Sequence, residues 1–173
     1  MALIPARRGS RRFPGKNMMK TQGKTLVEHA ICHAEGSLLI NKIVVLSADQ
    51  KVLRMKHAGV IFEEEPEELC GEYIQPIQYI RYIEEHYKYD VLVLLQPTSP
   101  TRKSKDIDWC IKLLLDSGVD SVVTFNRRVV HHLVPNGCIY VMRRGKEPYN
   151  DRMLGVTLES VDIDTKEDMD ALL

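Results

Sequence analysis

Short apolar runs rich in β-branched residues alternate along the chain with stretches whose apolar positions have helical spacing. The runs are ALIPA at 2–6, KIVVLSA at 42–48, VLVLLQP at 91–97, SVVTF at 121–125 and CIYVM at 138–142. Alternation of strand-like and helix-like segments is typical of an α/β fold. Because VLVLL at 91–95 is apolar throughout, it is predicted to be a central strand covered by helices on both faces.

Helices are predicted between these strands, at 25–36, 50–58, 72–87, 105–117 and 166–172. In the third, isoleucines recur every three residues, and Pro76 fits only in the first turn, where its missing amide hydrogen costs no hydrogen bond. Asp164 or Thr165 can cap the last helix. Residues 126–135 are predicted to be a short connection and 149–154 a surface loop. No repeat or linker interrupts residues 1–173, so one domain is predicted.

Composition narrows the class of protein. Lys plus Arg and Asp plus Glu number 24 each in 173 residues, so there is no global basic field of the kind that drives nucleic-acid binding. The four cysteines lie far apart without a Cys-x-x-Cys pair, which argues against a zinc knuckle and a disulfide framework. No apolar run reaches the length of a membrane span, and no signal peptide is recognisable. A cytoplasmic protein without a membrane partner is expected.

The loop LIPARRGSRRFPGKN, residues 3–17, concentrates positive charge directly after the first predicted strand. Ligands of open α/β sheets bind beyond the carboxyl ends of the strands. Gly9 and Gly15 let the backbone approach a ligand closely, and Arg7 and Lys16 can neutralise phosphate charge. The spacing matches neither the nucleotide-binding loop Gly-x-x-x-x-Gly-Lys-Ser/Thr nor the Gly-x-Gly-x-x-Gly fingerprint. The loop is therefore predicted to bind an anion in another way.

Four motifs in order resemble the cytidylyltransferases that activate nine-carbon and related ulosonic acids, the family of CMP-sialic acid synthetase. They are LIPARRGSRRFPGKN, LLQPTSPTR at 94–102, PNGCIYV at 135–141 and SVDIDTKEDMDAL at 160–172. The resemblance implies a three-layer α/β/α nucleotide-diphospho-sugar transferase-like fold with a mostly parallel sheet. It implies that CTP and a sugar acid such as sialic acid give a CMP-sugar and pyrophosphate, with Mg²⁺ as cofactor. It also implies a homodimer.

By this resemblance, the first loop binds the triphosphate. Arg7 and Lys16 are the expected catalytic cations. For Arg8, Arg11 and Arg12 a phosphate contact is not specifically implied, since surface solvation explains some of them equally well. The remaining substrate-binding positions implied for this loop are Gly9, Ser10 and Asn17.

The sugar acid is expected to contact later motifs. By resemblance the amide of Gln96 hydrogen-bonds the sugar acid, although capping of the turn made by Pro97 and Pro100 explains this residue equally well. Asn136 would form, with Gly137, the turn that presents the sugar pocket. Tyr140 would pack against the sugar, and an ordinary strand tyrosine is the alternative.

The sequence VDIDT places Asp162 and Asp164 two residues apart. If this segment is a strand, both carboxylates project to one face and Ile163 points into the core. Together they suit Mg²⁺, which prefers oxygen ligands and bridges to substrate phosphates. The family's Asp-x-Asp motif favours this assignment as catalytic metal ligands. The alternative is that Asp164 caps the last helix while Asp162 is a solvated residue.

Some positions depart from the family pattern. Glu65 stands where relatives have an arginine that helps to read cytosine, and the following 70–76 segment also differs. The connection from 125 to 136 is short, and Val134 stands at the position of the arginine expected to bind the sugar carboxylate. These differences keep a weak or non-catalytic nucleotide-binding relative open as a second hypothesis. A 3-deoxy-manno-octulosonate cytidylyltransferase is a third. A nucleic-acid-binding module is disfavoured by the neutral net charge.

Overall fold

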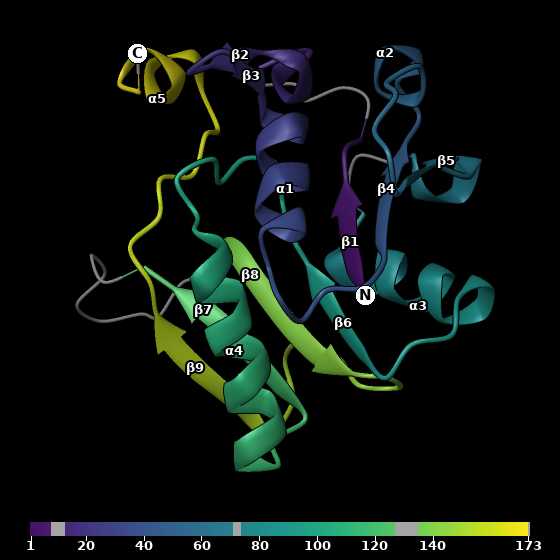
Figure 1. Cartoon of the computed structure of the whole chain (residues 1–173), viewed down its shortest axis with the longest axis vertical. Coiled ribbons are helices and arrows are strands. Elements are labelled where there is room, and N and C mark those ends of the chain that lie inside the picture. The colour runs from purple at the N-terminus through teal and green to yellow at the C-terminus, as the bar shows by residue number, and fades with distance from the viewer. Residues whose placement is uncertain (8–12, 71–73, 127–134, 173) are drawn as a thin grey trace.

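A computed structural model of the chain describes residues 1–7, 13–70, 74–126 and 135–172. Its main sheet has seven strands in the order β5-β4-β1-β6-β8-β7-β9 (Figure 1). Within the described residues, β8 alone runs antiparallel to its neighbours β6 and β7, and the other pairs in this sheet are parallel. The strands are β1 Ala2–Pro5, β4 Ile43–Ser47, β5 Val60–Glu64, β6 Val91–Leu94, β7 Ser121–Phe125, β8 Pro135–Arg143 and β9 Met153–Thr157.

Helices cover both faces of this sheet and confirm the three-layer α/β/α prediction (Figure 1). Buried residues of α1 (Leu26–Glu35) and α4 (Ser104–Ser117) pack on one face, and those of α3 (Pro76–His86) pack on the other. In β6, which lies mid-sheet as predicted, Val93 belongs to the first core and Leu92 to the second. The core is therefore divided by the sheet into two apolar layers.

Local sequence signals explain where several helices begin. Thr25 accepts a hydrogen bond from Glu28 N, and the Glu28 carboxylate accepts one from Thr25 N, which forms a capping box at α1. Thr165 and Asp168 form another at α5 (Lys166–Asp170). Pro76 is the first residue of α3, as its position in the first turn required.

Other predicted bounds were wrong. The helix predicted at 50–58 is the single turn α2 (Gln50–Leu53), because the chain then turns at Gly59, which has φ +78°, into β5. The loop predicted at 149–154 ends in β9, and the β2–β3 hairpin (Lys20–Thr21, Lys24–Thr25) was not predicted. Residues 72–73 of the predicted third helix and most of the predicted 126–135 connection lie outside the described residues.

Candidate functional site

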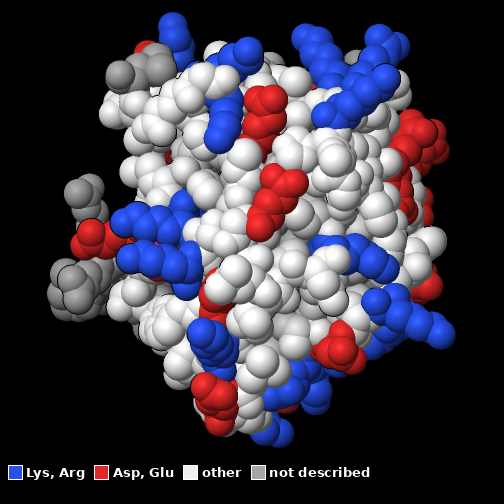
Figure 2. All heavy atoms as spheres, in the orientation of Figure 1, with Lys and Arg blue, Asp and Glu red and all other residues white. Residues whose placement is uncertain are grey.

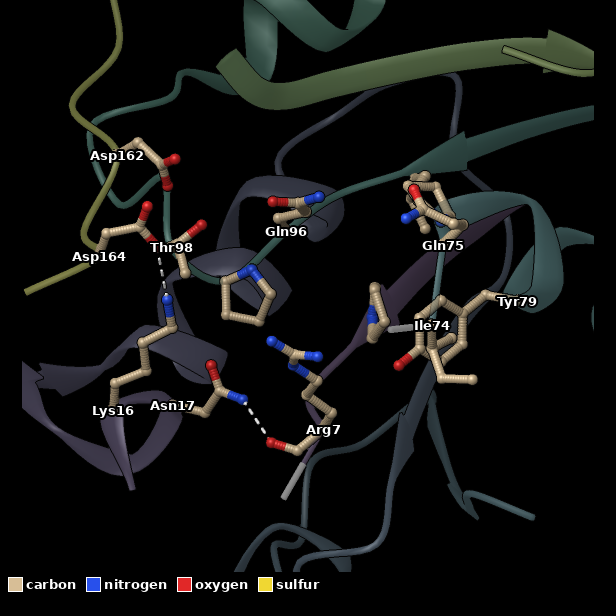
Figure 3. A pocket seen from close by; sticks show the side chains of 14 residues that line it. Arg7, Lys16, Asn17, Ile74, Gln75, Tyr79, Gln96, Thr98, Asp162 and Asp164 are labelled. Carbon is tan, nitrogen blue, oxygen red and sulfur yellow. Dashed lines mark hydrogen bonds and ion pairs between the residues drawn. The ribbon is translucent and has the colours of Figure 1, made fainter. Parts of the chain in front are cut away.

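A cavity of about 330 Å³ opens beyond the carboxyl ends of β1 and β6 (Figure 3). This edge of the sheet is where the first loop, the loop after β6 and the segment before α5 converge. Its lining combines cationic, acidic, amide and apolar side chains. The lining residues are Pro5, Arg7, Lys16, Asn17, Ile74, Gln75, Pro76, Tyr79, Leu94, Gln96, Pro97, Thr98, Asp162 and Asp164.

The first loop supplies the cations of the cavity. Gly15, with φ +71°, turns the chain into the 3₁₀ helix η1 (Lys16–Met18). The ammonium group of Lys16 donates to Asp164 Oδ1 at 3.1 Å and to the carbonyl of Ile163 at 3.0 Å. Asn17 Nδ2 donates to the carbonyl of Arg7 at 3.1 Å, which ties the two ends of the loop together (Figure 3). The structure thus brings together three of the loop residues expected to bind substrate.

The remaining residues predicted for this loop cannot be placed. Gly9 and Ser10, and the arginines at 8, 11 and 12, lie outside the described residues. Their assignment to a triphosphate site stays a prediction.

The segment that carries Asp162 and Asp164 is not a strand of the sheet, so that part of the prediction was wrong. Residues 158–164 belong to no strand, although Leu158 N still donates to Phe125 O of β7 at 3.0 Å. Instead Ile163 N donates to Thr98 O at 2.8 Å. The Ile163 side chain is fully buried against Phe13, Leu26 and Met169. Both carboxylates nevertheless line the cavity, on either side of this buried isoleucine in the chain (Figure 3).

The two carboxylates differ in their surroundings. Asp164 is half-exposed and paired with Lys16, whereas the Oδ1 atom of Asp162 is buried without a hydrogen-bond partner in the described part of the chain. Burial raises the pKa of Asp162, and the negative charge of Asp164 adds to this, while the Thr98 hydroxyl and Lys16 oppose it. Thr165, not Asp164, supplies the side chain that caps α5. The capping alternative for Asp164 is therefore not what the structure shows.

These donors fit a hard cation. An unpartnered, buried carboxylate oxygen is satisfied by a divalent ion, and Mg²⁺ commonly takes only one or two protein carboxylates together with water and phosphate oxygens. Over residues 1–7, 13–70, 74–126 and 135–172, no cluster of three or more His, Cys, Asp or Glu could hold a metal by itself. A site completed by substrate phosphates is the arrangement that these residues permit.

Gln96 follows β6 and points into the cavity between the acidic pair and Arg7 (Figure 3). Its side chain lies over Gly137: a Cβ built on that glycine would stand 2.5 Å from Gln96 Oε1. The backbone carbonyl of Gln96, rather than its side chain, accepts from Ser99 N at 3.4 Å in the following turn. The side chain therefore remains directed at the cavity.

The other two predicted sugar contacts do not line this cavity. Asn136 is 4% exposed, and its amide accepts from Thr124 Oγ1 and Cys138 N and donates to Leu158 O. Tyr140 is equally buried and meets Tyr149 edge to face. Both residues therefore shape the core near β8. Residues 127–134, the preceding segment, lie outside the described residues, so a sugar-binding role for Asn136 and Tyr140 stays a prediction.

The end of the cavity away from Asp162 and Asp164 was only partly predicted from the sequence. Ile74, Gln75 and Tyr79 line it, and the Tyr79 hydroxyl donates to Glu65 Oε1 at 2.9 Å. Glu65 is 4% exposed, and burial raises its pKa while Tyr79 and the positive charge of Arg7 oppose the shift. Tyr79 was missed because it reads as part of the apolar face of α3. The only signal was the unusual acidic residue at position 65.

Figure 2 shows lysine and arginine side chains interspersed with acidic ones over the face it presents. The equal numbers of basic and acidic residues agree with this picture. Among the described helices, none combines the length and apolar character needed to cross a bilayer.

The chain has the nucleotide-diphospho-sugar transferase fold, which it shares with solved structures. A solved structure of a CMP:2-keto-3-deoxy-manno-octonic acid synthetase complexed with CTP superposes with a TM-score of 0.74, covering 98% of this chain and 95% of that one at 14% identity. A cytidylyltransferase from Leptospira borgpetersenii superposes with a TM-score of 0.73, covering 99% and 83% at 20% identity. At these identities the likeness establishes the fold.

Sequence comparison establishes the family. The profile of the cytidylyltransferase family matches residues 1–153, and the chain belongs to that family. An N-acylneuraminate cytidylyltransferase of Streptococcus agalactiae is 30% identical over 135 residues, which are 76% of this chain and 33% of the relative. A CMP-N,N'-diacetyllegionaminic acid synthase of Legionella pneumophila is 30% identical over 120 residues, 65% of this chain and 52% of the relative. The chain thus spans about a third to a half of the length of these curated relatives.

Proposed function

We propose that the protein is a cytidylyltransferase that transfers CMP from CTP to the anomeric hydroxyl of a sialic-acid-like ulosonic acid and releases pyrophosphate. The observation that carries this proposal is the meeting of Lys16, Asp162 and Asp164 at one end of the cavity, with Arg7 and Gln96 beside them. Relatives named for activating N-acylneuraminate and diacetyllegionaminic acid support the substrate class.

The reaction needs positioning and charge neutralisation rather than a covalent enzyme intermediate. The sugar hydroxyl oxygen attacks the α-phosphorus in line and forms the new P–O bond. The bond from this phosphorus to the bridging oxygen breaks, its electron pair leaves with pyrophosphate, and the hydroxyl proton passes to water. Arg7 and Lys16 would bind the phosphate oxygens and offset the charge that develops on them. Gln96 would orient the sugar acid through its amide.

A divalent ion fits the acidic end of the cavity. Asp162 and Asp164 would hold it, and Mg²⁺ when bound would neutralise phosphate charge. Within the protein, Lys16 keeps Asp164 turned toward this end, and the backbone bond from Ile163 to Thr98 fixes the spacing of the two carboxylates. Asp162 contributes the carboxylate oxygen that the described residues leave unpartnered.

A second candidate is a nucleotide-binding relative with weak or no catalysis. It is favoured by Glu65, which occupies the position of the base-reading arginine and is buried against Tyr79. A 3-deoxy-manno-octulosonate cytidylyltransferase is a substrate variant of the first proposal, since such an enzyme of Thermodesulfovibrio yellowstonii is 26% identical over 134 residues.

One assay tests these candidates. The protein is incubated with Mg²⁺, each of the four nucleoside triphosphates and a panel of ulosonic acids, and pyrophosphate release is measured. We expect release with CTP and a nine-carbon acid. Pyrophosphate release only with 3-deoxy-manno-octulosonate, an eight-carbon acid, supports the 3-deoxy-manno-octulosonate cytidylyltransferase instead. Binding of CTP without pyrophosphate release in any combination contradicts the catalytic proposal and supports the non-catalytic one.

A further inference from the structure

Arg102 is a buried cation that the proposed reaction does not use. It is 2% exposed, and among the described residues it has no carboxylate partner. Its guanidinium instead donates through Nη1 to the carbonyl of Cys138 and through Nη2 to the carbonyl of Gln96, the latter at 3.1 Å. Burying a charge is unfavourable unless its donors are satisfied. The cost of burying this charge suggests that Arg102 has a specific structural role.

Those two carbonyls belong to different parts of the site. Gln96 follows β6, and Cys138 lies in β8 next to Gly137, the residue on which the Gln96 side chain rests. A guanidinium carries its donors in a rigid plane, so it fixes both the separation and the relative orientation of the two carbonyls. Arg102 thereby holds the backbone of Gln96 against the glycine that supports its side chain.

The same loop also holds the acidic segment. Between Gln96 and Arg102, the carbonyl of Thr98 accepts from Ile163 N at 2.8 Å, and Thr101 Oγ1 accepts from Val161 N at 2.9 Å. These two bonds flank Asp162 on either side. Displacement of the 96–102 loop would therefore move both the Gln96 amide and the Asp162 carboxylate, which lie beside each other in the cavity (Figure 3).

We propose that Arg102 is a positioning residue that lies outside the cavity and fixes the conformation of the 96–102 loop. Through this loop it holds Gln96 and the Asp162 segment in the positions needed to bind the sugar acid. The link to a sugar acid rests on the proposed function, whereas the link to loop geometry does not. Arg102 itself touches neither substrate nor metal in this scheme. Its contribution is to hold the 96–102 loop rigidly against the edge of the sheet.

A matched control for Arg102 lies in β8, the strand that contains Cys138. Arg143, at the other end of β8, is half-buried and also donates to backbone carbonyls, to Val119 O at 3.0 Å and Leu114 O at 2.8 Å. It lies away from the cavity lining. Arg143→Met removes an arginine with the same kind of bonding and leaves the loop in place.

The experiment compares Arg102→Met, Arg102→Lys and Arg143→Met by amide hydrogen exchange in the free protein. We expect Arg102→Met to speed exchange of the Ser99 and Ile163 amides about tenfold or more beyond any change in global unfolding. Arg102→Lys restores part of the protection, because one ammonium can satisfy one carbonyl. Arg143→Met leaves both amides unchanged. Unchanged exchange at both amides in Arg102→Met, or an equal change in Arg143→Met, overturns the proposal.

Kinetics supply the second arm. If sugar acid is turned over, Arg102→Met should raise its KM by about tenfold to a hundredfold, as small displacements of positioned groups do, with the KM for CTP changed less than about twofold. In the double variant with Gln96→Ala, Arg102→Met should not raise the KM for the sugar acid beyond the value of Gln96→Ala alone. Equal effects on both substrates contradict the proposal. If the wild type forms no CMP-sugar, the proposed function fails, and hydrogen exchange still decides the role of Arg102. If Arg102→Met does not fold, the Arg102→Lys measurements decide it.

Discussion

The ammonium nitrogen of Lys16 lies 3.1 Å from Oδ1 of Asp164, although 148 residues separate the two in the chain. The Lys16 side chain is only 14% exposed, and it also donates to the carbonyl of Ile163. One cation from the first loop is thus held against the acidic segment at the other end of the sequence.

Lys16→Ala should slow CMP-sugar formation by about three orders of magnitude, because charge neutralisation in phosphoryl transfer contributes several kcal/mol. The loss of stability should be only about 1 kcal/mol, since the lysine makes one partly exposed ion pair and one hydrogen bond. Pyrophosphate release and chemical denaturation measure the two effects. Lys146→Ala, which breaks the Lys146–Asp120 pair away from the cavity, is the control and should retain activity. Near-normal turnover by pure Lys16→Ala would remove Lys16 from the mechanism.

Asp162→Asn should weaken binding of Mn²⁺, used as a probe for Mg²⁺, in the presence of CTP by about tenfold to a hundredfold. The variant should also raise Tm at neutral pH, because it replaces a buried carboxylate whose charged form the fold disfavours. Electron paramagnetic resonance of free Mn²⁺ and calorimetry measure these changes. Asp120→Asn, outside the cavity, should leave Mn²⁺ binding unaltered. Wild-type Mn²⁺ affinity in Asp162→Asn contradicts the metal assignment.

His33 should make the protein acid-sensitive. Burial, with smaller contributions from the positive charge of Arg102 and from His29, lowers the pKa of His33 to about 4 from 6.5. Because the folded pKa is below the unfolded one, the unfolded state binds the proton first, and stability falls as the pH drops from 6.5 toward 4. His33→Gln should flatten this part of the curve of unfolding free energy against pH.

The control for this prediction is His86→Gln, which replaces an exposed histidine at the end of α3. Its curve should follow the wild type. If His33→Gln has the same acid sensitivity as the wild type, another group is responsible.

Gly137→Ala should impair use of the sugar acid. The glycine has φ +68°, and its new Cβ would stand 2.5 Å from Gln96 Oε1, so the Gln96 side chain must move. Gly145→Ala provides the control, since that glycine has φ +74° and open space around the added atom. Both variants should lose about 1–2 kcal/mol of stability from backbone strain. Only Gly137→Ala should raise the KM for the sugar acid, and equal KM values in the two variants would contradict a role for Gln96.

Sequence by itself determined the α/β class, the central position of β6 and the family. These features depend on local information: VLVLL is apolar on both faces, Thr165 can cap a helix, and ordered motifs can be compared one by one. The 3–17 loop and the VDIDT segment were recognisable as chemistry-bearing for the same reason. Edge strand β5 was missed because its pattern, VIFEE, is half polar, and its pairing partner β4 decides its conformation.

Only the tertiary structure decided which of these residues meet. It showed that VDIDT is not a strand of the sheet but is held by the hydrogen bond from Ile163 N to Thr98 O, and that Asn136 is buried in the core rather than lining the cavity. It also showed Arg102 fixing carbonyls from two separate elements. Such contacts join residues distant in the chain, and their geometry is set by how the sheet and loops pack. The sequence of one segment does not specify which distant residue will form hydrogen bonds with its polar groups.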